Sequence, residues 1–285
     1  MKHIILIGGG SIGKRHGGNL AALGSRITCV DPRSDRREEF TQAVAGTATF
    51  AGLSEAMDRG GPFDGMVVAS PTSFHVDQAV AGLESGLPVL LEKPVSIHLE
   101  DARRLEQALA KSQASLLMGY SWRWWPALWR VRELLDEQAI GKMRHVQFFL
   151  SAHLADWHPW ERYQDFYMAS RELGGGALLD ESHWIDLMLW LFGVPKRIFA
   201  RVGKISDLEI ETDDCVDMVV DYADGLQITL HQDLFGRPHE KSVRFIGEKG
   251  SILWTAEPNA VDVAHGMEQD WETTTFDCER NDMFM

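Results

Sequence analysis

A glycine-rich segment near the N-terminus constrains the fold most. The apolar run of residues 4–7 leads directly into glycines with G-x-G-x-x-G spacing, and a helical pattern follows to about residue 23. Between a strand and a helix, such glycines permit a tight turn and close approach of a pyrophosphate to the helix N-terminus. The alternative is a βαβ unit without nucleotide. The predicted cofactor contacts here are Gly8, Gly10, Ser11, Ile12 and Gly13.

An acidic residue follows the second predicted strand. Residues 26–30 are predicted to form this strand, and Asp31 comes directly after them. A carboxylate at this position accepts hydrogen bonds from the adenosine ribose hydroxyls and repels a 2′-phosphate. We therefore expect NAD rather than NADP, although Arg33, Arg36 and Arg37 lie close by and weaken that preference.

Polar residues also follow a later strand. Strands are expected at residues 65–69 and 88–92, with a helix at 74–86 between them. Ligands of doubly wound sheets bind at the carboxyl ends of the strands. Cofactor contact is therefore expected here, with a helix cap as the equal alternative. The residues concerned are Ser70, Pro71, Thr72 and His75.

The tripeptide Glu92-Lys93-Pro94 ends the next strand. Proline after Lys93 imposes an extended or turned backbone and permits a cis peptide bond. A lysine here would lie over the crevice near the nicotinamide, where partial burial lowers its pKa and suits it to proton transfer or to stabilising an alkoxide. A surface lysine at a turn is the alternative. Glu92 and Lys93 are both included in the predicted cofactor site.

A second glycine segment, residues 174–176, precedes a helical pattern. Consecutive glycines let the backbone approach a ligand or another strand closely. Asp180 and His183 are three residues apart, so a continuous helix places them on one face, with Leu187 and Trp190 extending the same stripe. A carboxylate beside an imidazole can form an acid–base pair. A buried histidine held by an aspartate is the alternative.

Aromatic and polar residues lie between these motifs. Residues 119–126 contain Arg123 among three tryptophans, and a helix at 127–138 and a strand at 143–151 follow. In the loop at 156–167, flat rings suit the C–H faces of sugars while polar groups bind hydroxyls. Packing of Arg123 on the tryptophans and an ordered loop or dimer contact are the alternatives. The predicted substrate contacts of this loop are Trp157, His158, Tyr163 and Tyr167.

From residue 197 onward the chain alternates between apolar and polar residues. Val216, Met218 and Val220 are spaced as in strands with one buried face, and glycine-containing turns occur at 224–225 and 249–250. This pattern predicts an open, mainly antiparallel sheet. Its free face requires a cover, so we expect a homodimer or homotetramer packed sheet to sheet.

The order of these motifs resembles that of the Gfo/Idh/MocA oxidoreductases over nearly the whole chain. The elements that carry the resemblance are Gly8-x-Gly10-x-x-Gly13, Ser70-Pro71-Thr72 with His75, Glu92-Lys93-Pro94, and the three glycines with Asp180 and His183. The resemblance implies an NAD(P)-dependent sugar or cyclitol dehydrogenase, with a Rossmann domain followed by an α/β domain. It also implies a substrate contact for Arg123, which resembles the family's arginine shortly before a proline.

Two features resemble one branch of the family, which is associated with surface-polysaccharide and nonulosonic-sugar pathways. These are the aromatic loop at 156–167 and the three-residue spacing of Asp180 and His183, where four is usual. The family's final helix, which returns to the Rossmann domain, has no evident counterpart before Met285. Such an end is expected of a truncated chain.

Length and composition set the remaining limits. The 285 residues suit two domains, a dinucleotide-binding domain at 1–120 and a substrate-binding and oligomerisation domain at 121–285. A net charge of −14 disfavours nucleic acid and anionic membranes as partners. The three cysteines are scattered and odd in number, which predicts no disulfide framework, no metal site and a reducing cytoplasm. No apolar run approaches the ~18 residues of a membrane helix.

These observations combine into one functional hypothesis. An α/β Rossmann domain with a parallel sheet and a second α+β domain would transfer hydride between NAD(H) and a sugar-like secondary alcohol or ketone. The catalytic residues would be Lys93, His183 and Asp180. The alternatives are an NAD-assisted glycoside hydrolase of the same fold and a non-catalytic NAD-sensing protein, and retention of Lys93 and His183 argues against the latter.

Overall fold

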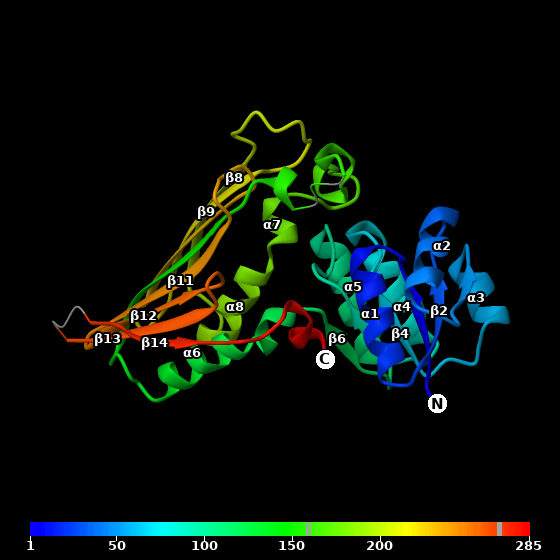
Figure 1. Cartoon of the computed structure of the whole chain (residues 1–285), viewed down its shortest axis with the longest axis horizontal. Coiled ribbons are helices and arrows are strands. Elements are labelled where there is room, and N and C mark those ends of the chain that lie inside the picture. The colour runs from blue at the N-terminus through cyan, green and yellow to red at the C-terminus, as the bar shows by residue number, and fades with distance from the viewer. Residues whose placement is uncertain (158, 160, 267–269) are drawn as a thin grey trace. The chain divides into compact units, whose positions relative to one another are not determined.

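The computed structural model describes residues 1–157, 159, 161–266 and 270–285 (Figure 1). The chain forms two compact units. Unit 1 comprises Met1–Tyr120, Glu172–Gly174 and Phe284–Met285, and unit 2 comprises Ser121–Arg171 and Gly175–Met283. Among the described residues, no helix has both the length and the apolar character that crossing a membrane requires.

Unit 1 contains a six-stranded sheet in the order β3-β2-β1-β4-β5-β6, and every strand pair is parallel. The strand order reverses between β1 and β4, which is where doubly wound sheets bind nucleotides. The predicted Rossmann sheet is therefore confirmed. The strands are β1 His3–Ile7, β2 Arg26–Val30, β3 Ala48–Phe50, β4 Gly65–Val68, β5 Val89–Leu91 and β6 Leu116–Met118.

Hydrophobic side chains cover both faces of this sheet. Ile5 and Ile7 of β1 belong to one buried cluster, while Leu6 belongs to another with Cys29 and Phe40. Successive strand residues thus face opposite cores, as expected when helices cover both faces of a parallel sheet. The helices are α1 Ser11–Ala22, α2 Ser34–Ala43, α3 Leu53–Arg59, η1 Thr72–Phe74, α4 His75–Glu84 and α5 Leu99–Lys111.

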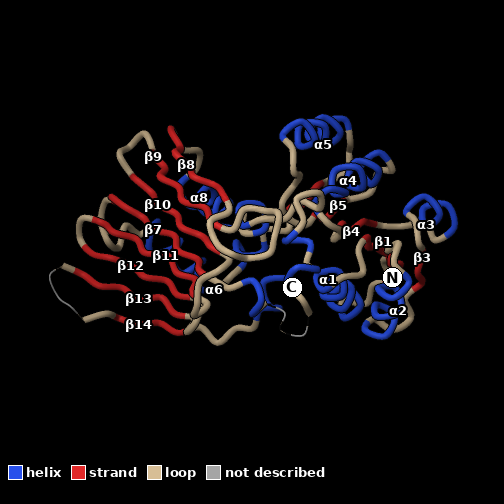
Figure 2. The backbone as a smooth tube through the Cα atoms, turned by 90° about the horizontal axis from the view of Figure 1, so that it is seen from above, coloured by secondary structure: helices blue, strands red, loops and turns tan. Residues whose placement is uncertain are grey.

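Unit 2 contains an eight-stranded sheet in the order β14-β13-β12-β11-β7-β10-β9-β8, with the strands side by side in Figure 2. Among the strands that the structure describes in this sheet, only β7 and β10 pair in parallel, which confirms the mainly antiparallel sheet. The strands are β7 Met143–Ser151, β8 Arg197–Gly203, β9 Cys215–Asp221, β10 Gln227–Asp233, β11 Glu240–Gly247, β12 Gly250–Thr255, β13 Ala260–His265 and β14 Glu272–Thr275.

The helical elements of unit 2 are mostly short. The α-helices are α6 Pro126–Asp136, α7 Ala177–Asp180 and α8 His183–Phe192. The 3-10 helices are η2 Ser121–Trp124, η3 Leu154–Asp156, η4 Tyr163–Asp165, η5 Tyr167–Ala169 and η6 Arg280–Phe284.

The two faces of the eight-stranded sheet differ in their cover. Val216, Met218 and Val220 are buried as predicted. On the buried face, Trp184 of α8 packs against Phe148 and Trp254, with ring centroids 5.9 and 6.1 Å away. We call this the inner face, and the opposite one the outer face. The outer face carries the polar and exposed residues of the alternating pattern.

The end of the chain contributes to unit 1. Phe284 of η6 lies edge-on to the His16 ring of α1, with 5.6 Å between centroids. The Arg15 guanidinium lies 5.2 Å from the centroid of the same Phe284 ring. Although the sequence shows no evident final helix, the last residues therefore pack on the helix that follows the first glycine segment.

Candidate active site

The first glycine segment has no room for side chains at two positions. Gly8 has φ +100°, and a Cβ there would lie 2.4 Å from the Ala69 carbonyl oxygen. A Cβ on Gly13 would lie 1.9 Å from the Gly8 carbonyl oxygen. These contacts hold the N-terminus of α1 against the ends of β1 and β4.

The same segment leaves space where a pyrophosphate must approach. A Cβ on Gly10 would meet no described atom within 4 Å. Among the described residues, no side chain caps α1 and no acidic residue occupies its first turn. The first backbone N–H groups of this helix are therefore suited to an anion, and the residues present fit NAD.

Asp31 is anchored to the glycine segment. Its Oδ2 accepts a hydrogen bond from Gly9 N at 2.8 Å, and its Oδ1 accepts one from Arg33 N at 2.9 Å. The carboxylate is buried. These bonds fix a negative charge beside the glycine turn, where a ribose hydroxyl can donate to the remaining lone pairs.

The neighbouring arginines are engaged with protein groups. Arg33 forms an ion pair with Asp35, with Nη2 and Oδ2 2.5 Å apart. Arg37 Nη1 donates to the carbonyl oxygens of Asp31 and Pro32 at 2.6 and 3.0 Å. The Asp35 carboxylate therefore compensates the charge of Arg33, whereas Arg37 is bound to neutral carbonyl oxygens and keeps its positive charge close to Asp31.

His75 connects two segments of the predicted cofactor site. Its Nδ1 lies 2.7 Å from the Pro94 carbonyl oxygen and its Nε2 lies 2.8 Å from that of Ser70. Burial lowers the pKa of His75, although both carbonyl oxygens act to raise it. The imidazole thus holds the turn after β4 against the turn after β5. Its contact with the cofactor stays a prediction.

Glu92 has a buried partner that the sequence analysis missed. His16 Nε2 lies 2.7 Å from Glu92 Oε1, and both side chains are buried. The second carboxylate oxygen accepts a hydrogen bond from Lys93 N at 3.3 Å. Glu92 therefore joins α1 to the turn that carries Lys93. The Lys93–Pro94 peptide bond is cis, as the sequence permits.

The second glycine segment is as tightly enclosed as the first. A Cβ on Gly175 would lie 2.3 Å from the Met168 carbonyl oxygen. Gly176 has φ +113°, and a Cβ there would lie 2.3 Å from Asp213 Oδ1. Asp213 Oδ2 also accepts a hydrogen bond from Leu178 N at 2.8 Å. Asp213, which the sequence analysis missed, therefore fixes the start of α7.

The prediction of one continuous helix through Asp180 and His183 is wrong. Helix α7 ends at Asp180 and α8 begins at His183. At the break, Ser182 N bonds to Leu179 O and Trp184 N to Glu181 O, so three-residue bonds replace the four-residue bonds of an α-helix. The argument that both residues share one regular helix face therefore does not apply.

Two carboxylates beside this break have partners elsewhere in unit 2. The Tyr167 hydroxyl donates to Asp180 Oδ1, which brings together a predicted substrate residue and a predicted catalytic residue. Glu181 is buried, and its Oε1 lies 3.6 Å from Lys241 Nζ. These separate attachments hold the chain where the helix is interrupted.

Trp122 forms the centre of an aromatic cluster beside His183. The His183 ring lies edge-on to Trp122 with 6.5 Å between centroids. Trp184 stacks on Trp122 at 6.3 Å, and Trp254 lies edge-on at 5.4 Å. Lys241 Nζ lies 5.5 Å from the Trp122 ring centroid. The sequence analysis identified neither Trp122 nor Lys241 as a site residue.

Arg123 is held by a carboxylate of α8. Its Nε lies 2.7 Å from Asp186 Oδ2 and its Nη2 lies 2.6 Å from Asp186 Oδ1. This bidentate geometry fixes the guanidinium plane relative to the helix that begins with His183. The contact of Arg123 with substrate stays a prediction.

The predicted substrate residues of the aromatic loop differ in how far the structure defines their contacts. The Tyr163 hydroxyl accepts a hydrogen bond from Glu209 N at 3.3 Å. Trp157 is half-buried, and its indole Nε1 has no hydrogen-bond partner among the described residues. His158 lies outside the described residues.

Lys93 belongs to unit 1 and His183 to unit 2, and their convergence on one substrate oxygen stays a prediction.

Comparison with known proteins defines the class. Residues 2–120 match the oxidoreductase family with an NAD-binding Rossmann fold, and residues 128–253 match the GFO/IDH/MocA C-terminal domain. The chain belongs to the Gfo/Idh/MocA family of NAD-binding oxidoreductases, which confirms the resemblance of its motifs.

Several relatives extend over most of the chain. The rhizopine catabolism protein MocA of Rhizobium meliloti is 28% identical over 77% of this chain and 67% of its own length. Glucose-6-phosphate 3-dehydrogenase of Bacillus subtilis is 22% identical over 94% of this chain and 78% of its own length. The WlbA dehydrogenase of Bordetella pertussis, solved with NADH and UDP-GlcNAcA, has a TM-score of 0.77 and 25% identity over 90% of this chain and 78% of its own.

Proposed function

We propose that this protein transfers hydride between NAD(H) and a secondary alcohol or ketone of a sugar, a sugar derivative or a cyclitol. The observation that carries the proposal is the match of both halves of the chain to one oxidoreductase family. Relatives named as glucose-6-phosphate 3-dehydrogenase and inositol 2-dehydrogenase support this substrate class. The same proposal places the protein in the cytoplasm. It assigns dinucleotide binding to residues 1–120, and substrate binding and oligomerisation to residues 121–285.

The proposed roles follow from the chemistry of the side chains. NAD, held by the glycine segment and Asp31, supplies the hydride acceptor when it is bound. His183 removes the hydroxyl proton of the substrate as a general base. Lys93 orients the substrate oxygen and stabilises its developing negative charge. Asp180, which accepts a hydrogen bond from Tyr167, orients His183 or a neighbouring substrate hydroxyl.

Substrate recognition is proposed for the polar and aromatic residues of unit 2. Arg123 is held in place by Asp186 and is suited to bind hydroxyl or carboxylate oxygens. The rings of the loop are suited to the C–H faces of a sugar. The loop residues in this proposal are Trp157, His158, Tyr163 and Tyr167.

The test of this function is a screen for NADH formation. Sugars, sugar acids, cyclitols and nucleotide sugars are ranked first by thermal shift with NAD present, because a ligand of the folded state raises its stability. The best binders are then assayed for NADH absorbance and for oxidised product. Release of a free sugar from a glycoside without net NADH formation would support the glycoside hydrolase alternative instead.

We expect NAD(H) to bind at least about tenfold more tightly than NADP(H), a difference of about 1.4 kcal/mol. The reason is the fixed Asp31 carboxylate, which would face a 2′-phosphate. Asp31→Asn keeps an acceptor for Gly9 N but removes the charge, so the ratio should fall. Fluorescence titration of both cofactors measures it, with the exposed Asp58→Asn as control. Equal binding by the unaltered protein would contradict the assignment.

We also propose a homodimer or homotetramer that packs through the outer face of the sheet. Phe199, Val219 and Ile246 are 62%, 38% and 38% exposed on this face. Covering such a patch removes apolar surface from water. Light scattering should show more than one chain per particle, and Phe199→Asp should lower the molar mass, whereas Leu23→Asp in unit 1 should not. A monomer at micromolar concentration would rule this assembly out.

A further inference from the structure

A cluster of metal-ligating side chains lies where β9 and β10 pair. Asp217 is the register partner of His231, and Cys215 is the register partner of Asp233. All four side chains project from the outer face. The intervening Gln232 projects the other way, and its Nε2 donates to the Ala177 carbonyl oxygen of α7 at 2.8 Å. The cluster is thus separated from α7 by the thickness of the sheet.

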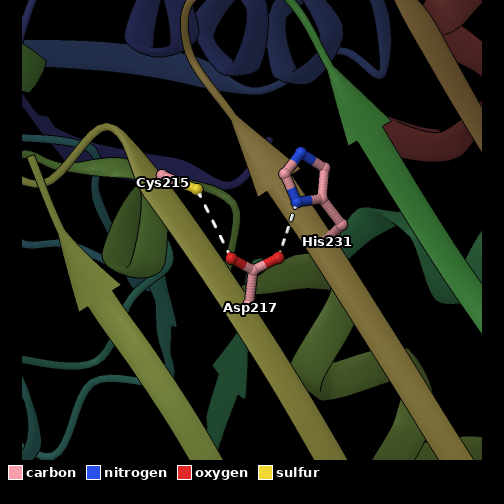
Figure 3. A group of neighbouring side chains, drawn as sticks. All are labelled: Cys215, Asp217 and His231. Carbon is pink, nitrogen blue, oxygen red and sulfur yellow. Dashed lines mark hydrogen bonds and ion pairs between the residues drawn. The ribbon is translucent and has the colours of Figure 1, made fainter. Parts of the chain in front are cut away.

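Asp217 forms the centre of this cluster (Figure 3). Its Oδ1 lies 2.7 Å from His231 Nδ1, and its Oδ2 accepts a hydrogen bond from the Cys215 thiol at 3.7 Å. One donor atom from each of the three residues lies within 4.8 Å of the others. A thiolate, an imidazole and a carboxylate are the ligand types of zinc sites, whereas Mg²⁺ and Ca²⁺ prefer oxygen ligands alone.

Asp233 orients the imidazole. Its Oδ2 lies 3.1 Å from His231 Nε2, while its Oδ1 accepts hydrogen bonds from Phe235 N at 3.0 Å and Gly236 N at 2.6 Å. A histidine that binds a metal usually donates its other ring N–H to a carboxylate, which fixes the tautomer. Asp233 is buried and suited to this role, which leaves the Nδ1 lone pair directed toward Asp217. The Phe149 ring stacks on His231 at 5.4 Å.

We propose that Cys215, Asp217 and His231 bind one Zn²⁺ ion, with a fourth position open to water. Ligand atoms about 2.0 Å from zinc lie about 3.3 Å apart at tetrahedral angles. The Asp217–His231 contact therefore has to widen by only about 0.6 Å, an adjustment within reach of a half-exposed imidazole and an exposed carboxylate. Both residues line a hollow on the outer face, through which an ion can enter before the proposed packing of another copy covers that face. Arg201, the register partner of Asp217 on β8, is a cation that would compete with zinc for the Asp217 carboxylate.

The ion would link the start of β9 to the end of β10, on the sheet face opposite α7 and α8. This inference is independent of the proposed oxidoreductase function, because none of the three ligands is assigned to cofactor, substrate or catalysis. Failure to bind zinc would leave the proposed function unaffected.

The test uses the untagged full-length chain, freed of metal with a chelator and incubated with Zn²⁺ alone. After gel filtration, the zinc content measured by elemental mass spectrometry should equal one ion per chain. Substitution with Co²⁺ should give a thiolate-to-cobalt charge-transfer band that Cys215→Ser removes. His231→Gln should weaken zinc binding by more than about 100-fold, and Asp233→Asn by about 10–100-fold, the range for a residue that orients a metal ligand.

Two matched variants serve as controls. Cys278→Ser removes another thiol, and His145→Gln removes another outer-face histidine, whose Nε2 lies 3.3 Å from Thr229 Oγ1. Both should keep one zinc. If circular dichroism shows that Cys215→Ser does not fold, the loss of zinc binding is tested with Asp217→Asn instead, because Asp217 is exposed. Undetectable zinc in the unaltered chain, or equal zinc in all variants, would overturn the proposal.

Discussion

Alanine at Lys93 is expected to lower kcat on the order of 10²-fold or more, because it removes both a hydrogen-bond donor and a positive charge from the developing oxyanion. Alanine at His183 is expected to lower kcat by roughly 10²–10⁴-fold, the usual contribution of a positioned general base. NAD affinity should change little in the His183 variant, and in the Lys93 variant it should fall far less than kcat, since the glycine segment and Asp31 carry most of the proposed cofactor contacts. Single-turnover measurement of NADH formation isolates the chemical step.

Two further variants make this test specific. Lys111→Ala removes a lysine from the last turn of α5 and should leave kcat unchanged. If both side chains act on one oxygen, kcat of the double variant of Lys93 and His183 should be only slightly lower than that of the less active single variant. The effects of residues that work as a unit are strongly non-additive. Independent, multiplicative losses would show that the two side chains act at separate places.

The second large effect is expected on stability. His16→Leu should lower the free energy of unfolding by about 1–3 kcal/mol, since it leaves the buried Glu92 side chain without the imidazole that lies 2.7 Å from Oε1. The double variant His16→Leu with Glu92→Met should recover much of this loss, because an apolar pair of similar volume replaces both hydrogen-bonding partners. Urea denaturation of the NAD-free protein compares both variants with the unaltered protein.

The control for this cycle is an exposed pair in the same unit. Lys2 and Asp64 form an ion pair on the surface, with Nζ and Oδ1 3.0 Å apart. Removing Lys2 should cost no more than about 1 kcal/mol, as exposed pairs usually do. If His16→Leu costs no more than the Lys2 variant, the buried pair contributes little, and the link from α1 to the Lys93 turn is weak.

Several predictions from sequence were confirmed because their signals are local. The first strand, its glycines, the following helix and the second strand occur within residues 3–30, and β1, α1 and β2 have nearly the expected bounds. Alternation of Val216, Met218 and Val220 likewise matches their burial. Short-range periodicity reflects which side chains a helix or strand exposes or buries, so it predicts burial without knowledge of the tertiary contacts.

The helix through Asp180 and His183 shows where local periodicity is insufficient. The residues after Gly176 have a helical rhythm, yet the helix is interrupted at Glu181 and Ser182. Asp180 bonds to Tyr167 and Glu181 approaches Lys241, and both partners lie outside the helical segment. Tertiary contacts of this kind override a weak intrinsic helical preference.

The sequence by itself determined the Rossmann unit, the mainly antiparallel second sheet and the family. Only the tertiary structure decided which side chains meet. His16 reaches Glu92 because parallel strand order places α1 beside the end of β5, and Asp213 occupies the space that Gly176 leaves open. Cys215, Asp217 and His231 meet through the register of β9 with β10. Sheet order arises from packing of the whole chain, so no local pattern encodes the first two pairings. The register of β9 with β10 is set more locally, by the hairpin turn between them, in which Tyr222 N donates to the Leu226 carbonyl oxygen.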